Sequence, residues 1–144
     1  MYRYPARFEL DVKMGTYTVT FPDFKWGVTQ GDDADDAMET ARDLLKILVK
    51  DAIDSGGDLP TPSRARGRNA MLVSLSALHE AKLALYFAMR EARLRNSDLA
   101  RRLRKPVAHV RQLLDLDQSS KIDHLETAFR VLEKSIGIQV RSAA

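Results

Sequence analysis

A stretch rich in proline, glycine and arginine, over residues 59–69, divides the 144-residue chain into parts with different hydrophobic periods. A stretch of this composition cannot bury a core, so it must connect packed elements on either side. Before it, apolar residues first alternate and then recur at helical spacing, whereas after residue 75 the spacing is helical throughout. The pattern predicts an α+β fold, with a small sheet domain followed by an all-α domain.

The first part predicts a β-β-β-α-β domain. Alternating apolar residues predict four strands, over residues 4–12, 16–21, 24–30 and 71–75. Asp32 or Asp33 can cap a helix whose apolar stripe runs from Ala37 to Ile53. We therefore expect a first domain over residues 1–63 plus a strand at 70–75, with residues 64–69 as a linker.

The second part, residues 76–144, predicts four helices. A helix capped by Ser76 is followed by two short ones, the first capped by Asn96 or Ser97 and ending at Leu103, and the second running from Pro106 to about Leu114. A fourth is expected over residues 122–136, ended by Gly137. Residues 138–140 could add a terminal strand, which is a candidate seam between subunits.

The net charge of +3 conceals an asymmetry between the two parts. Residues 1–63 carry 7 basic and 12 acidic side chains, a net charge of −5, and residues 64–144 carry 16 and 8, a net charge of +8. Such asymmetry indicates two partners of opposite sign. The chain has no cysteine, no signal-peptide apolar region and no long apolar run, so we expect a cytoplasmic protein without disulfides or thiolate metal sites.

The two short helices carry the strongest functional signal. Residues 96–114 read NSDLARRLRKPVAHVRQLL, which resembles the helix-turn-helix of phage-repressor-like DNA-binding proteins. Ala100 is small where the helices must cross closely. The turn position that is usually glycine is Arg104, so the turn must adopt a left-handed conformation at some energetic cost.

In such a motif the second helix enters the major groove, and its outward residues reach the bases. The residues predicted to face the bases are Val107, Ala108, Arg111 and Gln112, with His109 nearby. Those predicted to contact phosphates are Asn96, Ser97, Lys105, Ser119, Ser120 and Lys121. The alternative is an ordinary four-helix domain with a solvated, arginine-rich face.

Other polar clusters have simpler explanations. The acidic run from Asp32 to Asp36 could be a two-metal nuclease centre, but a helix cap explains it without metal. The three histidines are too scattered to indicate a metal site, and no cofactor is expected. Phe24 and Trp26 fit either a core position or an exposed anchor for a protein partner.

The order of motifs along the whole chain resembles the HicB antitoxin family, in the branch that has a C-terminal helix-turn-helix. The motifs are a strand and turn YTVTFPDF, then TQGD before a capped helix, DAM within it, an LPTPS exit and a late KID, at residues 17–24, 29–32, 36–38, 59–63 and 121–123. The resemblance implies an N-terminal domain with a partial ribonuclease-H-like fold that lacks the catalytic carboxylates, and hence no enzyme activity.

The resemblance also implies two partners. In the family, the N-terminal domain occludes a HicA toxin, an mRNA-cleaving ribonuclease, and the C-terminal domain binds operator DNA as part of a homodimer or tetramer. We assign toxin contact to four residues at the turn after the second strand and at the start of the expected third strand, Pro22, Asp23, Phe24 and Trp26. Two alternatives remain, a stand-alone regulator with a ligand-sensing N-terminal domain and a ribonuclease-H-like nuclease.

Overall fold

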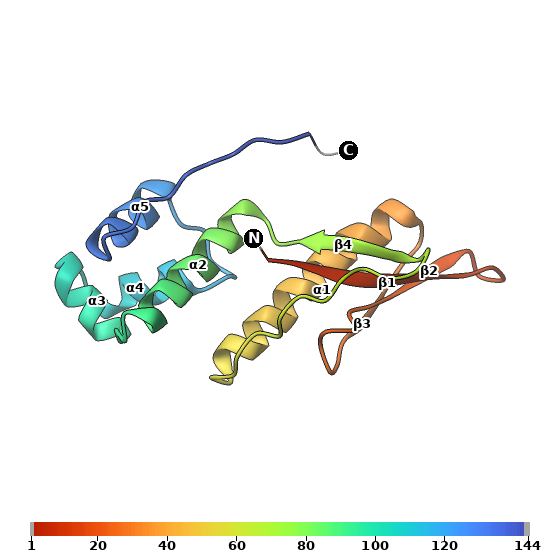
Figure 1. Cartoon of the computed structure of the whole chain (residues 1–144), viewed down its shortest axis with the longest axis horizontal. Coiled ribbons are helices and arrows are strands. Elements are labelled where there is room, and N and C mark those ends of the chain that lie inside the picture. The colour runs from red at the N-terminus through yellow and green to blue at the C-terminus, as the bar shows by residue number, and fades with distance from the viewer. Residues whose placement is uncertain (1, 143–144) are drawn as a thin grey trace. The chain divides into compact units, whose positions relative to one another are not determined.

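The computed structural model describes residues 2–142 and has an α+β fold (Figure 1). Its elements are β1 (Arg3–Asp11), β2 (Thr16–Thr20), β3 (Val28–Gly31), α1 (Ala34–Asp54), β4 (Ala70–Ser74), α2 (Ala77–Glu91), α3 (Asn96–Leu103), α4 (Val107–Leu114) and α5 (Ile122–Val131). The chain divides into two compact units between Ser76 and Ala77. The first holds the sheet and α1, and the second holds the other helices, so the expected α+β class is confirmed.

The first unit is an antiparallel sheet with the strand order β3-β2-β1-β4. Tyr4, Ala6 and Phe8 alternate along β1 and are buried, as is Val19 on β2. The buried stripe of α1, which includes Leu45, supplies the other side of this core. The other face of β1 carries Pro5 and Arg7, and within the described part of the first unit no helix packs on it, because α1 is the helix of that unit.

The acidic run at the start of α1 acts as a helix cap. Of the two residues considered, Asp33 is the N-cap, and its Oδ1 accepts a hydrogen bond of 2.8 Å from the amide of Asp36. The carboxylate of Asp36 in turn accepts a 2.8 Å bond from the amide of Asp32. The first bond satisfies an amide of the first turn that the helix leaves without an acceptor, and the second ties the residue before the cap to the helix.

The third strand is shorter than its sequence predicts. The expected strand began at Phe24, but β3 begins at Val28, so this prediction was wrong for residues 24–27. The amide of Phe24 closes a turn onto the carbonyl of Phe21, at 3.1 Å. Gly27 has a φ of +102°, and a Cβ there would lie 2.9 Å from a methyl group of Leu48. The segment bends because it passes close against α1.

The 59–69 segment is fastened at three points to the first unit. The hydroxyl of Tyr4 donates to the carbonyl of Pro60 at 2.9 Å, and burial raises the pKa of this hydroxyl to about 12. The amide of Ser63 donates to Oδ2 of Asp23 at 2.9 Å. The amide of Phe8 donates to the carbonyl of Asn69 at 2.8 Å. The segment is therefore an ordered connection between α1 and β4, held to the sheet by these hydrogen bonds.

The position of this segment changes the charge of each part. Its three arginines lie in the first unit, which ends at Ser76. Residues 1–76 then hold 10 basic and 12 acidic side chains, a net charge of −2, and residues 77–144 hold 13 and 8, a net charge of +5. The first part is still negative and the second still positive, but the two net charges differ less than the −5 and +8 obtained by dividing the chain at residue 63.

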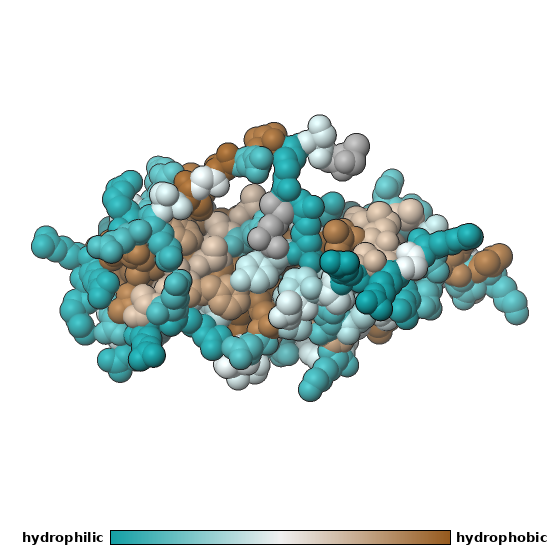
Figure 2. Space-filling model, viewed as in Figure 1, coloured by the Kyte–Doolittle hydropathy of each residue, from teal (hydrophilic) through white to brown (hydrophobic). Residues whose placement is uncertain are grey.

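The second unit packs α2, α3, α4 and α5 around one apolar core, whose largest fully buried side chains include Leu85, Leu99, Leu113 and Leu125. In Figure 2 polar residues cover much of the visible surface. No helix among residues 2–142 is long and apolar enough to cross a membrane.

The C-terminal end of the second unit differs from the prediction. The expected helix over residues 122–136 ends at Val131, because the chain turns at Glu133, which has a φ of +58°, and the amide of Lys134 bonds the carbonyl of Phe129 at 2.9 Å. The expected strand at 138–140 is absent from this described stretch, where Ile138 is 80% exposed. A strand needs a neighbouring strand for its hydrogen bonds, and the described part of this unit offers none.

Candidate functional site

The connection between α3 and α4 is a tight left-handed turn. Arg104 follows α3 with φ +55° and ψ +43°, which confirms the conformation predicted for this position. The amide of Arg104 donates a hydrogen bond to the carbonyl of Arg101 at 3.1 Å, and the amide of Lys105 donates one to the carbonyl of Ala100 at 3.0 Å. These bonds satisfy carbonyls at the end of α3. Pro106 then caps α4 with extended backbone, which sets the direction of the second helix.

The start of α3 differs by one residue from the prediction. The N-cap is Arg95 rather than Asn96 or Ser97, which lie in the first turn. The amide of Arg95 donates to the carboxylate of Asp98 at 2.9 Å, and this bond lowers the pKa of Asp98. Asn96 is half-buried and Ser97 is exposed at the positive end of α3, where an anion would be favoured.

Buried apolar side chains fix α3 and α4 against the rest of the unit. Ala100 is 3% exposed at the crossing, where a small residue was predicted, and Val110 of α4 is fully buried. Val107 also packs against this core, so it is only partly available to a ligand. Ala108, Arg111 and Gln112 are exposed. The polar face of α4 is therefore held by the packing of its apolar face.

The structure gathers three of the six predicted phosphate contacts, Ser119, Ser120 and Lys121, around one hollow of about 370 Å³, here called the α4–α5 hollow, whereas Asn96, Ser97 and Lys105 lie outside its lining. It is lined by His109, Gln112, Leu113, Ser119, Ser120, Lys121 and His124. Arg111 lies outside this lining. The hollow thus combines hydroxyls, an amide, a lysine and two imidazoles, all groups that can donate hydrogen bonds to a phosphate or a base edge.

Two histidines meet at this hollow, although they are 15 residues apart in the sequence. The rings of His109 and His124 pack edge to face, with their centroids 5.1 Å apart. Burial lowers the pKa of His109, and the positive charges of His124 and Lys105 lower it further. The sequence patterns do not indicate this pair, because the contact depends on how α4 and α5 pack. Among residues 2–142, no three His, Asp or Glu side chains form a group able to hold a metal ion.

Lys82 on α2 positions the end of α4 beside this hollow, and the sequence patterns above did not single it out. Its side chain is fully buried, and Nζ lies 2.7–2.9 Å from the carbonyls of Gln112, Asp115 and Gln118 and from Oγ of Ser120. Burial lowers the pKa of this amine, while Asp115 acts in the opposite direction. A signal was present in the sequence, because Lys82 lies four residues after Leu78 and three before Leu85 and so falls on the apolar face.

The four residues assigned to toxin contact lie on the loop between β2 and β3. They differ in how far they are exposed and in what their side chains contact. Phe24 packs against the rings of Tyr4 and Phe21, at centroid distances of 4.9 and 6.3 Å. Trp26 is 51% exposed, and its indole donates to Asp51 of α1 at 3.3 Å. Pro22 is exposed, and Asp23 holds Ser63. Pro22 and Trp26 are the members best placed to meet a partner.

Comparison with known proteins identifies the kind of protein that carries these features. The family model described as "HicB_like antitoxin of bacterial toxin-antitoxin system" matches residues 3–84. The chain is thus an antitoxin of the toxin–antitoxin class. It is 31% identical to Antitoxin HicB 2 of Photorhabdus laumondii over 93% of either chain. It is 29% identical to Antitoxin HicB of Escherichia coli K12 over 94% of this chain and 97% of the other. The chain belongs to the HicB-like antitoxin family.

Among solved structures, the antitoxin HicB of Burkholderia pseudomallei matches with 26% identity and a TM-score of 0.45. That match covers 54% of this chain and 65% of the other.

Proposed function

We propose that this antitoxin has two activities. Its first unit binds a HicA-like mRNA-cleaving ribonuclease and occludes it, and its second unit represses the operon of the pair by binding operator DNA. In this proposal α3 and α4 form a helix-turn-helix, and α4 lies in the major groove. The protein acts in the cytoplasm as a homodimer or tetramer, because one short motif reads too little sequence alone.

The observation that carries the DNA-binding activity is the turn at Arg104. The left-handed turn joins two eight-residue helices, the close crossing at Ala100 is buried, and α4 exposes Arg111 and Gln112. Residues 77–144 carry a net charge of +5, which favours a polyanion. Left-handed residues also follow α2 and α5, at Arg93 and Glu133, so DNA binding is supported by the turn at Arg104 in combination with two short helices and the exposed polar side chains of α4.

The toxin-binding activity is supported by family membership and by the first unit. That unit places three antiparallel strands, a helix and a fourth strand beside the first, an arrangement compatible with a partial ribonuclease-H-like fold. Its net charge is −2, and a ribonuclease that binds RNA is expected to be basic. Opposite charges accelerate the encounter of two proteins.

A cell-free cleavage assay tests the first activity. The product of the neighbouring small reading frame is incubated with mRNA, with and without the full-length antitoxin. We expect the antitoxin to co-purify with that product and to suppress cleavage. Persistent cleavage at a molar excess of antitoxin would refute occlusion. Cleavage by the antitoxin alone, abolished by Asp23→Asn or Asp36→Asn, would instead favour the nuclease alternative.

A gel-shift assay with the DNA upstream of the operon tests the second activity. We expect a discrete complex that competitor DNA of unrelated sequence does not displace, and whose affinity falls steeply with salt. Binding to this DNA without any binding to the toxin would favour the stand-alone regulator. Equal affinity for unrelated DNA would contradict sequence-specific repression.

A further inference from the structure

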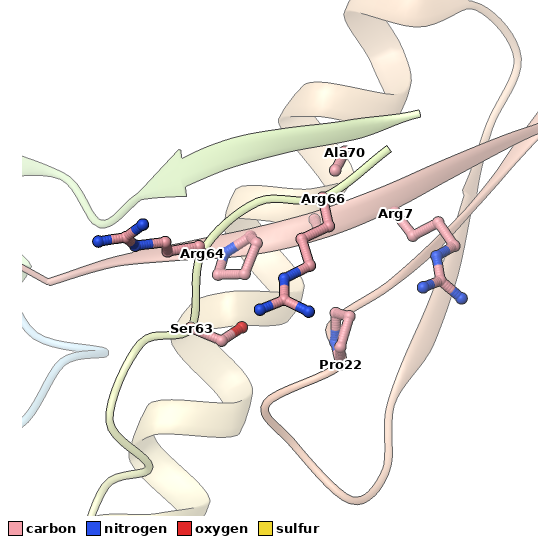
Figure 3. A pocket seen from close by; sticks show the side chains of 8 residues that line it. Arg7, Pro22, Ser63, Arg64, Arg66 and Ala70 are labelled. Atoms are coloured by element: carbon pink, nitrogen blue, oxygen red, sulfur yellow. The ribbon is translucent and has the colours of Figure 1, made fainter. Parts of the chain in front are cut away.

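The face of the sheet opposite α1 carries a pocket with an unusual concentration of arginine. The pocket has a volume of about 300 Å³ and is lined by Pro5, Ala6, Arg7, Pro22, Ser63, Arg64, Arg66 and Ala70. We call it the arginine pocket (Figure 3). It lies between β1, the start of the loop after β2 and the 59–69 segment, so three separate parts of the first unit form its walls.

Arg7 and Arg66 supply unpaired positive charge to the arginine pocket. Figure 3 shows the Arg66 side chain extending across the pocket with Ser63 on one side and Arg7 on the other, whereas Arg64 extends away from them. Neither Arg7 nor Arg66 has a salt-bridge partner in the described part of the chain. The carboxylate of Asp23, which accepts the amide of Ser63 at the edge of the pocket, forms no ion pair with either arginine. Two guanidinium groups are therefore free to bind an anion.

The walls of the arginine pocket are held in place before any ligand arrives. The Asp23–Ser63 bond ties the 59–69 segment to the loop after β2, and the Phe8–Asn69 bond ties its end to β1. Pro5 and Pro22 give the floor and one wall a fixed backbone. A pocket that is already formed spends less binding free energy on ordering its groups.

We propose that the arginine pocket receives an aspartate or glutamate side chain of the toxin. This inference rests on the proposed function and adds the feature that orients the two proteins. A guanidinium binds a carboxylate through two parallel hydrogen bonds, which fix direction as well as distance. Pro22 belongs both to this pocket and to the loop assigned to toxin contact, so the pocket is continuous with that surface.

The surroundings favour a protein carboxylate over RNA. A site for single-stranded RNA combines a long basic groove with aromatic side chains on which bases stack. The lining of the arginine pocket contains no aromatic side chain, and the unit around it has a net charge of −2. A single basic pocket in an acidic unit is suited to one acidic group on a basic partner, and it penalises any partner that lacks this group.

Binding of the full-length antitoxin to its cleavage-inactive toxin tests the proposal, by calorimetric titration at two salt concentrations. We expect Arg66→Ala and Arg7→Ala each to weaken binding about tenfold, or about 1.4 kcal/mol. Arg68→Ala is the matched control, because it removes the same charge from the same exposed segment outside the pocket. Thermal unfolding should be unchanged in all three variants, since these side chains are exposed.

A second measurement identifies the group that the pocket receives. Each aspartate and glutamate of the toxin is changed to alanine, and one is expected to lose its effect when Arg66 is already alanine, as a double-mutant cycle would show. Arg66→Ala binding as tightly as Arg68→Ala, or no toxin residue coupled to Arg66, overturns the proposal.

Two further outcomes separate this inference from the proposed function. If Arg66→Ala abolishes binding to a short single-stranded RNA and leaves toxin binding unchanged, the pocket is an RNA site and the carboxylate proposal is wrong. If the wild-type antitoxin does not bind the toxin at all, the proposed occlusion fails and this inference fails with it.

Discussion

The ammonium of Lys82, fully buried on α2, donates a 2.8 Å hydrogen bond to the carbonyl of Gln112 near the end of α4. The same Nζ reaches Asp115 and Gln118 in the chain that follows. A helix leaves its last carbonyls without amide partners, and a cation there also interacts favourably with the helix dipole. Lys82 therefore fixes where α4 ends and how the chain enters α5.

Replacing Lys82 should destabilise the second unit. In Lys82→Met the carbonyls of Gln112, Asp115 and Gln118 lose their common donor at a part-buried site, which we expect to cost about 3 kcal/mol of unfolding free energy. Urea denaturation of the full-length chain measures this loss. Lys121→Met, at an exposed lysine, should change the value by less than about 0.5 kcal/mol. An equal response of the two variants would contradict this role of Lys82.

Glycine at position 104 should stabilise the protein. Arg104 has a φ of +55°, a conformation that costs a residue with a Cβ about 1 kcal/mol relative to glycine. Arg104→Gly should therefore raise the unfolding free energy by about that amount, as measured by thermal or urea denaturation. Arg102→Gly, inside α3, is the control and should lower it by about 1 kcal/mol.

Arg104 and the cap of α1 show what the sequence alone could predict, and Lys82 shows what it could not. The conformation of Arg104 followed from the resemblance to a helix-turn-helix, in which glycine usually holds this turn position, and a cap at Asp32 or Asp33 followed from the place of these residues before a helical stripe. Both depend on contacts within a few residues of the chain. The contacts of Lys82 with Gln112 and Gln118 span 30 and 36 residues, so they depend on the packing of helices, which a periodic pattern does not specify.

The incorrect predictions have the same origin. Residues 24–27 have the composition of a strand, yet Gly27 passes close against Leu48 of α1, and this contact replaces the strand with a bend. The apolar residues at 138 and 140 predicted a strand over 138–140, but a strand forms only where another strand offers hydrogen bonds. Strand propensity describes the conformation that a segment favours, and its tertiary contacts decide whether the segment adopts that conformation.

Base recognition by α4 can be tested at two exposed side chains. Arg111→Ala or Gln112→Ala should weaken operator binding by about 1 to 3 kcal/mol and relax the preference at one base position. Gel shifts on the operator and on single-base variants measure both effects. Arg130→Ala, which removes an exposed arginine of α5 outside the predicted contacts, is the control. Unchanged affinity and preference in the α4 variants would mean that another surface reads the bases.

A phosphate contact should behave differently from a base contact. Lys121, at the start of α5 in the α4–α5 hollow, is predicted to meet the DNA backbone. Lys121→Ala should weaken binding to all sequences by a similar factor and reduce the slope of log affinity against log salt by about one. Titrations at several salt concentrations provide the slope. A change in base preference without a change in slope would place Lys121 against a base instead.

Acid should destabilise the second unit through His109. Its pKa in the folded protein lies below the ordinary value of 6.5, chiefly because burial disfavours the imidazolium and also because His124 and Lys105 are positive. The unfolded chain therefore takes up this proton more readily, so the stability present at neutral pH declines as the pH falls from 6.5 through the lower, folded-state pKa. Urea denaturation across this range measures the decline.

The variant His109→Gln isolates this contribution, because it keeps a polar side chain that cannot be protonated. Its unfolding free energy should fall less between neutral and acid pH than that of the wild type. DNA is expected to act in the opposite direction. A phosphate in the α4–α5 hollow would favour the charged imidazolium, so operator binding should strengthen as the pH falls, and less so in His109→Gln. Identical pH profiles for His109→Gln and wild type would show that the imidazole of His109 has no such influence.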